Sequence, residues 1–354
     1  MQTAVITLPL MRKSEKLRCG ILGTGRMLGK FADAFRLIDD AMLVAAASRD
    51  PERARMEAKK HGIPRAHSGY ESLIGDAQID VIINALHNGL HCEWTVRALE
   101  AGKHVLCEKP LACSSPEVER MFAAAHANQR WLMEGFMHRF HPQMAEARRL
   151  VATGAIGRVM HIRSHRTARG RDRDNPRYSR DAGGGALLDV GCYCVNVSRL
   201  FADAEPKRVL AHAHFDEQTG VDLTLSGTLQ FDGGVTAHLI CSMEAEPSYP
   251  VEIVGTDGKL LIPHPWLPQT SPAELYLTRD GKTEVIRVEA DDAPQDALAP
   301  YALELKHFCE CVRENRAPQF PPDIDAEADS RANMRVIDAL SESARAGRVV
   351  DVTA

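Results

Sequence analysis

Three side chains suited to acid–base chemistry, Lys109, Asp189 and Tyr193, stand beside glycines or at the end of an apolar run. Asp189 and Tyr193 belong to the segment G-G-G-A-L-L-D-V-G-C-Y, whose glycines precede a helical pattern. Side chains four positions apart share one face of a helix, so we expect the carboxylate and the phenol to lie together. A phenol can deliver a proton to a reacting oxygen or remove one from it.

Lys109 follows a short apolar stretch at 104–107 that is typical of a buried parallel strand. The carboxyl ends of parallel strands face the ligand crevice of an α/β sheet, so we expect Lys109 to point there. Its charge beside Tyr193 would lower the pKa of the phenol. Asp189 would orient either the substrate or Lys109. A phenol, an ammonium and a carboxylate placed together suit hydride transfer to a carbonyl, because the carbonyl oxygen needs a proton when its carbon receives the hydride.

A glycine-rich turn near the start of the chain predicts a dinucleotide site. The segment L-R-C-G-I-L-G-T-G-R-M follows a strand pattern and opens a helix, whose N-terminus can hold a pyrophosphate. Gly23 allows the tight turn and Gly25 lets the pyrophosphate approach the backbone. The third glycine of the pattern is replaced by Leu28, and Gly29 comes one residue later. The loop residues expected to contact the cofactor are Gly23, Thr24, Gly25, Arg26 and Met27.

The second strand pattern ends in A-A-A-S-R-D instead of an acidic residue. An Asp or Glu at that point would bind the ribose hydroxyls of NAD. Ser48 and Arg49 can instead bind a 2′-phosphate, by hydroxyl donation and guanidinium pairing. Asp50 comes one residue late and is better placed to cap the next helix, which Pro51 begins. The sequence therefore favours NADP(H) as the cofactor, with NAD(H) as the alternative.

Strand and helix patterns alternate through the first third of the chain. Residues 81–86 form a continuous apolar run, as in a strand that is covered on both faces. Helical spacing follows it at 91–102 and recurs at 116–128. This alternation predicts a parallel sheet with right-handed crossovers, that is, a Rossmann dinucleotide-binding domain over 17–138.

The pattern changes after residue 138. Residues 221–231 alternate apolar and polar side chains, which predicts a strand with one buried face. Aspartate–glycine turns between such segments predict hairpins. We therefore expect an α+β domain over 139–354, with a large, mostly antiparallel open sheet and late helices near 299–314 and 327–346.

Composition narrows the class of protein. The 354 residues correspond to roughly two domains, and 44% hydrophobic with 26% charged residues excludes wholesale disorder. A net charge of −5 argues against a dedicated nucleic-acid binder, and no apolar run has the length of a membrane span. Nine scattered cysteines fit free thiols in the cytoplasm. Residues 1–16 are expected to form a flexible arm, with Met11 as an alternative start.

Four motifs give the chain a resemblance to a known family. They are N-A-L-H-N-G-L-H-C-E-W at 84–94, A-G-K-H-V-L-C-E-K-P-L-A at 101–112, E-G-F-M-H-R-F-H-P-Q at 134–143 and G-G-G-A-L-L-D-V-G-C-Y at 183–193. Together they resemble the glucose–fructose oxidoreductase and inositol dehydrogenase family, called Gfo/Idh/MocA, over residues 17–354. The R-F-H-P motif and Tyr193 resemble the corresponding residues of one branch of this family, which contains glucose–fructose oxidoreductase and dimeric dihydrodiol dehydrogenase.

The resemblance implies an NAD(P)-dependent oxidoreductase of a sugar or a sugar-like polyol or ketone. It also implies a cis bond between Lys109 and Pro110, and Tyr193 as the proton donor. His87 stands where relatives usually have proline. Subunits of the family often pair through the second-domain sheet, which implies a homodimer or a homotetramer. The further contacts implied are Leu86, Asn88, His91, Glu108 and Lys109 for the cofactor, and His91, Arg139, Arg177 and Tyr193 for the substrate.

Some alternatives stay open. The segment 163–180 holds seven arginines, which form either a solvated loop or a site for an anionic substrate or for the cofactor phosphates. A ligand sensor on the same fold would not need Tyr193, and an NAD-dependent glycosidase fits Ser48 and Arg49 poorly. Histidine pairs lack a third ligand at a known spacing, so no metal site is expected. Neither nucleic acid nor a membrane is expected as a partner.

Overall fold

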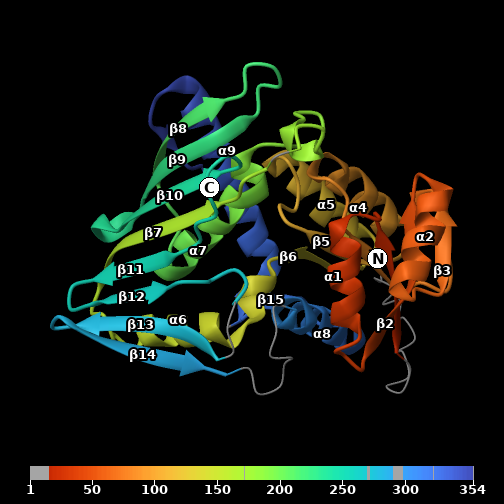
Figure 1. Ribbon diagram of the computed structural model, residues 1–354, viewed down its shortest axis with the longest axis horizontal. Coiled ribbons are helices and arrows are strands. Elements are labelled where there is room, and N and C mark those ends of the chain that lie inside the picture. The colour runs from red at the N-terminus through yellow and green to blue at the C-terminus, as the bar shows by residue number, and fades with distance from the viewer. Residues whose placement is uncertain (1–15, 171, 269–271, 290–297, 322, 354) are drawn as a thin grey trace, which may run out of the picture.

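A six-stranded parallel sheet forms the first part of the computed structural model (Figure 1), which describes residues 16–170, 172–268, 272–289, 298–321 and 323–353. Its strand order is β3-β2-β1-β4-β5-β6. The expected N-terminal arm lies almost entirely outside the described residues. The strands are β1 (Leu17–Leu22), β2 (Ala41–Ser48), β3 (Arg65–Ser68), β4 (Val81–Asn84), β5 (His104–Glu108) and β6 (Leu132–Gly135).

Helices connect these strands, as right-handed crossovers require. They are α1 (Arg26–Phe35), α2 (Pro51–His61), α3 (Tyr70–Ile74), α4 (His91–Glu100) and α5 (Ser115–Ala127). Asp50 caps α2 as expected, because its carboxylate accepts hydrogen bonds from the backbone N–H groups of Glu52 and Arg53. The Rossmann fold predicted from the alternating pattern is confirmed. The short elements β3 and α3 carry too few residues for a periodic pattern and were not expected.

A nine-stranded mixed sheet forms the second part, in the order β14-β13-β12-β11-β7-β10-β9-β8-β17. Only β7 and β10 pair in parallel among its described strands, so the expectation of a mostly antiparallel sheet is confirmed. The strands are β7 (Val159–Thr167), β8 (Arg208–Phe215), β9 (Asp222–Gln230), β10 (Thr236–Ser242), β11 (Val251–Gly255), β12 (Lys259–Ile262), β13 (Ala273–Arg279), β14 (Lys282–Val288) and β17 (Val350–Asp351). A separate small pair joins β15 (Gln319–Phe320) and β16 (Ile324–Asp325).

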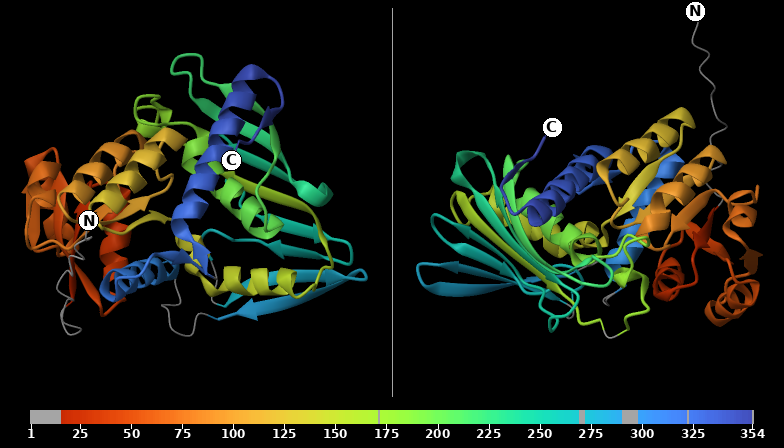
Figure 2. Two further views of the ribbon diagram at one scale, coloured as in Figure 1. Left: turned by 180° about the vertical axis from the view of Figure 1, so that it is seen from behind. Right: turned by 90° about the horizontal axis from the view of Figure 1, so that it is seen from above.

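Helices cover one face of the large sheet. α6 (Pro142–Ala152), α7 (Cys192–Ala202) and α9 (Ala326–Ala346) lie on this face, and no described helix covers the other face (Figure 2). α8 (Ala299–Glu314) returns to the first part and packs against α1. Residues distant in sequence therefore meet where the two parts join.

Strand β9 shows how the sequence pattern produces this layering. Leu223, Leu225 and Leu229 are buried under the helices, whereas Ser226 and Gln230 are exposed on the uncovered face. The period of two thus assigns the strand's faces as expected.

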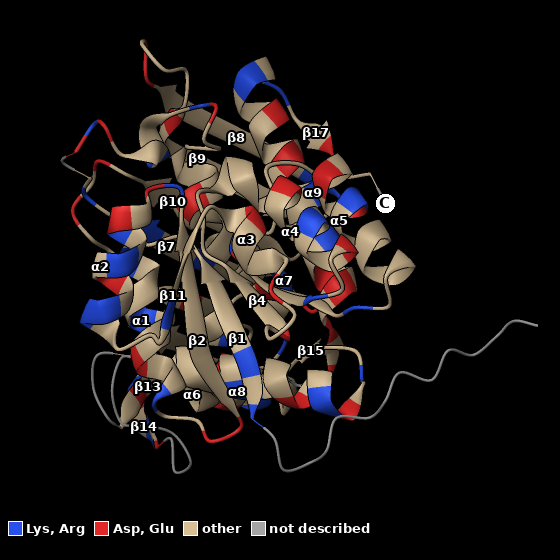
Figure 3. Ribbon diagram, turned by 90° about the vertical axis from the view of Figure 1, so that its right-hand side faces the viewer, with Lys and Arg blue, Asp and Glu red and all other residues tan. Residues whose placement is uncertain are grey.

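Charged side chains of both signs lie on the helices, and β2 and β4 carry none (Figure 3). No described helix is both long and apolar enough to cross a membrane. All nine cysteines are free.

Candidate active site

Two adjoining cavities lie at the carboxyl ends of the parallel strands. The outer cavity has a volume of about 630 Å³ and is lined from the glycine turn to the end of β2. The inner cavity has a volume of about 390 Å³ and reaches Lys109 and Tyr193. Arg26, Asn88 and Asp189 line both cavities, so a single elongated ligand can occupy the two.

The glycine turn has the form that a dinucleotide diphosphate needs. Gly23 has φ +100°, and a Cβ added there would lie 3.0 Å from the carbonyl oxygen of Ala85. A Cβ on Gly25 would meet no atom within 4 Å, so the backbone there is open to a ligand. Gly25 is the N-cap of α1 and forms no side-chain cap hydrogen bond, which leaves N–H groups for an anion. These residues fit the group that the sequence predicts.

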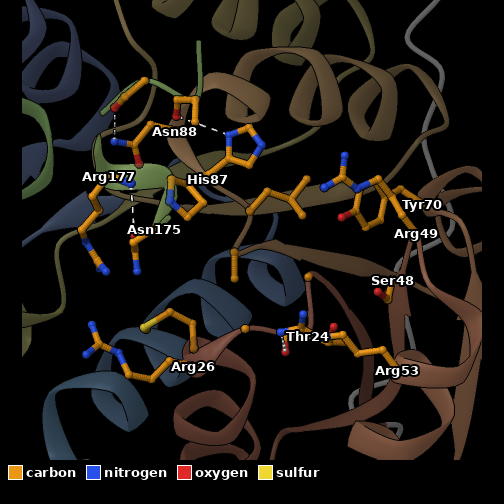
Figure 4. Close-up of a pocket in the computed structure, with 18 of the residues that line it drawn as sticks. Thr24, Arg26, Ser48, Arg49, Arg53, Tyr70, His87, Asn88, Asn175 and Arg177 are labelled. Carbon is orange, nitrogen blue, oxygen red and sulfur yellow. Dashed lines mark hydrogen bonds between the residues drawn. The ribbon is translucent and has the colours of Figure 1, made fainter. Parts of the chain in front are cut away.

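The far end of the outer cavity is lined by Ser48, Arg49, Arg53 and Tyr70 (Figure 4). The guanidinium of Arg53 donates a hydrogen bond to the carbonyl of Thr24 at 3.3 Å, which ties α2 to the glycine turn. The sequence reasoning missed Arg53, although it follows Arg49 by four positions. Asp50 also lines this end of the cavity, and its Oδ1 accepts the two hydrogen bonds that cap α2.

Asp189 joins two cations at the boundary of the cavities. Its backbone carbonyl accepts a hydrogen bond from Lys109 Nζ at 2.7 Å, and its Oδ1 lies 3.5 Å from the same nitrogen. Arg177 Nε donates to Oδ2 at 2.6 Å. Burial acts to raise the pKa of Asp189, but Lys109 and Arg177 outweigh it and hold that pKa below its usual value. The expectation that Asp189 orients Lys109 agrees with this contact. The Lys109–Pro110 bond is cis, as the resemblance implied.

Tyr193 is buried, and its hydroxyl points toward the sulfur of Met137 at 3.5 Å. The guanidinium of Arg166 lies 4.0 Å from the centre of its ring, closer than Lys109 Nζ at 5.1 Å. Burial raises the pKa of Tyr193 well above its usual value, and Arg166 opposes that rise. The expected lowering by Lys109 is therefore wrong for this structure. Arg166 was expected only as one of the seven arginines of a loop over 163–180, but residues 163–167 belong to β7.

The spacing argument for Asp189 and Tyr193 also needs correction. A π-helical turn spans Leu187–Gly191 before α7 begins, so the two residues do not follow ideal α-helical geometry. Both nevertheless reach Lys109, since Asp189 binds its ammonium and the Tyr193 ring lies beneath it. Such turns are frequent at functional sites.

His91 does not occupy the position that was expected. It is fully buried, with Nδ1 at 2.8 Å from the carbonyl oxygen of Pro110 and Nε2 at 3.0 Å from that of Leu86. Burial lowers its pKa to about 4. His91 lines neither cavity and instead joins the two backbone segments that carry Leu86 and Lys109.

Asn88 and His87 are held by the loop before the π-helical turn. Asn88 Nδ2 donates to the carbonyl of Gly183 at 2.8 Å, and His87 Nδ1 lies 3.3 Å from that of Ala182 (Figure 4). Leu86 and Asn88 line both cavities, as expected of cofactor contacts.

Arg139 is likewise not a cavity residue. Its guanidinium is buried, donates to Asn196 Oδ1 at 3.2 Å and lies 3.5 Å from Asp329 Oδ2. The substrate contact expected for Arg139 has no support in this structure, because its guanidinium contacts Asn196 and Asp329 inside the protein and lines neither cavity. Arg177, in contrast, lines both cavities.

Lys30 and Tyr301 also line the inner cavity and were not expected. Lys30 on α1 reaches Tyr301 on α8, with 3.4 Å between Nζ and the phenol oxygen. Glu108 also lines this cavity, and burial raises its pKa while Lys109 and Lys30 act to lower it. No described group of three or more His, Cys, Asp or Glu side chains could hold a metal ion.

A helix N-terminus that is open to a diphosphate, next to a cavity with a lysine, an aspartate and a tyrosine, defines a nucleotide-dependent oxidoreductase. The chain belongs to the Gfo/Idh/MocA family of oxidoreductases: residues 17–136 match the model described as oxidoreductase family, NAD-binding Rossmann fold, and residues 144–261 match the GFO/IDH/MocA C-terminal domain. It is therefore an oxidoreductase with an NAD(P)-binding Rossmann domain.

Named relatives share most of the chain. D-xylose 1-dehydrogenase (NADP(+)) 2 of Haloferax volcanii is 36% identical over 94% of this chain and 99% of its own. Trans-1,2-dihydrobenzene-1,2-diol dehydrogenase of Xenopus laevis is 39% identical over 69% of this chain and 74% of its own.

Solved structures agree with the fold. A 3-ketoreductase from Actinomadura kijaniata, in complex with NADP and TDP-benzene, superimposes with a TM-score of 0.86 at 28% identity, over 93% of this chain and 98% of its own. An aldose–aldose oxidoreductase from Caulobacter crescentus, complexed with glycerol, has a TM-score of 0.82 at 28% identity, over 95% and 100%.

Proposed function

We propose that this enzyme transfers a hydride between NADP(H) and a carbon of a sugar or a sugar-like polyol or ketone. The observation that carries the proposal is the cluster of Lys109, Asp189 and Tyr193 at the inner end of two joined cavities, where a nicotinamide and a small substrate can meet. The xylose dehydrogenase and the aldose–aldose oxidoreductase among its relatives support a sugar as the substrate.

Tyr193 is the proposed general acid in reduction and the general base in oxidation. In oxidation its phenolate oxygen removes the proton of the substrate hydroxyl, and in reduction its hydroxyl returns a proton to the carbonyl oxygen. Arg166 stabilises the phenolate from the ring face. Lys109 is held by Asp189 and can donate a hydrogen bond to the substrate oxygen.

The cofactor supplies the hydride acceptor or donor when it is bound. The glycine turn would hold its diphosphate, and Ser48, Arg49 and Arg53 would hold the 2′-phosphate. Arg49, just after β2, and Arg53 on α2 support NADP(H) over NAD(H), because a 2′-phosphate is the charge that they would match.

A panel of sugars and carbonyl compounds, followed by NADPH absorbance, tests this function. Tyr193→Phe keeps the ring and removes the proton, so turnover should fall by about 10²–10⁴-fold while NADP binding is retained. Tyr276→Phe is the matched control, because its hydroxyl binds Glu274 outside both cavities. Near-normal turnover by Tyr193→Phe would assign the proton to another group. Specific binding without any turnover would favour a sensor.

A further inference from the structure

The inner cavity carries an excess of positive charge. Six basic and three acidic side chains line it among the described residues. Asp189 already binds two of the cations, Lys109 and Arg177. The basic residues are Arg26, Lys30, Lys109, Arg166, Arg169 and Arg177, and the acidic ones are Glu108, Asp172 and Asp189.

Arg166 forms no ion pair within 4.0 Å in the part of the chain that the structure describes, although it acts on Asp189 over a longer distance and helps to lower the pKa of that carboxyl. Its guanidinium stacks on Tyr193 and also lies 5.4 Å from the ring centre of Trp266. Its Nε is buried without a hydrogen-bond partner. The rest of the guanidinium is partly exposed, so a ligand in the cavity can reach it, and the buried Nε gains a hydrogen bond only if a ligand or water supplies the acceptor.

Lys30 stands in a similar position one helical turn after Arg26. Its hydrogen bond goes to the neutral phenol of Tyr301, and no described carboxylate lies within 4.0 Å of its Nζ. Burial lowers the pKa of Lys30, and the nearby cations, Arg26 foremost, lower it further. Glu108 opposes them, but burial favours the uncharged form of that carboxyl. The potential at Lys30 is therefore positive.

The phosphates of the cofactor do not account for these two cations. The outer cavity has its own anion-binding groups at the N-terminus of α1 and at the end of β2. Two other arginines of the 163–180 segment are paired, since Arg163 lies 2.7 Å from Glu252 and Arg173 lies 2.9 Å from Asp216. Arg166 thus remains unpaired beside the proton donor, in a cavity whose low dielectric strengthens its attraction for an anion.

We propose that the inner cavity binds an anionic substrate, a sugar or sugar-like carbonyl compound with a carboxylate or a phosphate, through Arg166 and Lys30. This inference rests on the proposed function, because the same cavity would hold the substrate during hydride transfer. It adds the charge of the substrate and the two residues that recognise it.

The test compares D-glucose, D-glucuronate and D-glucose 6-phosphate, which share one ring and differ in charge. Calorimetry on the NADP-loaded enzyme should give at least one acid a Kd at least tenfold below that of glucose. The Kd values of D-glucuronate and D-glucose 6-phosphate show whether the cavity prefers a carboxylate or a phosphate. Where the compounds turn over, kcat/KM should rank them in the same order, and added salt should lower it for the preferred acid more than for glucose.

Variants assign the effect to the two cations. Lys30→Met and Arg166→Met should each reduce the ratio of acid to glucose affinity by about tenfold or more, while circular dichroism shows an intact fold and the Kd of NADP is unchanged. Arg173→Met is the matched control, because it removes an arginine of the same segment whose charge is bound to Asp216.

Three outcomes would overturn the inference: neither acid binds more tightly than glucose, the ratio does not change in Lys30→Met and Arg166→Met, or these variants lose NADP instead. Turnover of neutral sugars without a preference for acids would refute only the anionic substrate. Absence of turnover with every carbonyl compound would refute the proposed function, whereas the binding measurements would still decide about the anion.

Discussion

Replacement of Arg166 by methionine should make Tyr193 harder to ionise. The substitution keeps an apolar stem beside Trp266 and removes the charge that lies 4.0 Å from the ring centre of the tyrosine. A positive charge favours the phenolate, so its loss raises the pKa of the phenol. Oxidation needs the phenolate as proton acceptor. The acidic limb of its pH profile should therefore move to higher pH.

The size of the shift follows from the geometry. A guanidinium that stands 4.0 Å from the ring centre is expected to lie about 5 Å from the phenol oxygen, and a charge at that separation contributes about 3 kcal/mol at an effective dielectric constant of about 20. Arg166 is partly exposed, so solvent screening reduces this to about half. Since one pKa unit corresponds to about 1.4 kcal/mol, the acidic limb of the pH profile should move by about one pH unit.

Other groups around Tyr193 must be considered in the same experiment. Burial raises its pKa most, and Glu108, Cys192 and Asp189 raise it further. The ring centres of His138 and Tyr193 lie 5.4 Å apart. The buried Tyr301 is close enough for ionisation of Tyr193 to raise its pKa. None of these residues is substituted in Arg166→Met, so the difference between the two profiles reports the loss of the Arg166 charge, together with its effect on the pKa values of His138, Asp189 and Cys192.

The assay is kcat/KM for oxidation of a neutral sugar, measured from neutral to strongly alkaline pH. A neutral substrate separates this effect from the binding of an anion. Arg166→Lys keeps a positive charge and should retain most of the original limb. If the acidic limb of Arg166→Met coincides with that of the original enzyme, Arg166 does not stabilise the phenolate and the electrostatic reasoning is refuted.

Three further predictions concern the cofactor, the fold and assembly. Arg49→Ala should weaken NADP binding by about 1–3 kcal/mol with little change in NAD binding. The control Arg55→Ala, on the exposed side of α2, should change the binding of neither cofactor. Equal weakening of NADP and NAD binding by Arg49→Ala would contradict the 2′-phosphate assignment. Burial raises the pKa of Asp222 to about 6 in the folded state, so ionisation of this carboxyl destabilises the folded protein. The free energy of unfolding should therefore decrease by about 2 kcal/mol as pH rises from about 4 to about 6. Asp222→Asn should remove this part of the pH dependence in urea unfolding, and parallel curves for the two proteins would refute it. The uncovered face of the large sheet carries few charges along β9, so light scattering should show a homodimer or a larger even assembly, and a monomer would contradict this.

Local patterns predicted most of the fold. The alternation of strands and helices gave the parallel sheet, and the period of two placed the leucines of β9 on the buried face. Both patterns depend on neighbours within a few positions, which is why they can be read without the tertiary structure. The five-residue helix α3 and the edge strand β3 are too short for such patterns.

The errors at the site come from contacts between distant segments. Arg139 and His91 stand in motifs of the resemblance, but one is bound to Asn196 and the other to two backbone carbonyls. Whether a polar side chain faces a cavity or a buried partner depends on what packs against it, and the motif does not contain that information.

The sequence by itself determined the glycine turn, the Asp50 cap and the position of Lys109 at the end of a parallel strand, because local backbone geometry and strand order suffice for these. Only the tertiary structure decided which charges surround Tyr193. Arg166 arrives from β7 of the large sheet and Lys30 from α1, and Tyr301 from α8 meets Lys30 across about 270 residues of chain. Electrostatic interactions act through space over several ångströms, so the charge of the inner cavity is a property of the folded chain.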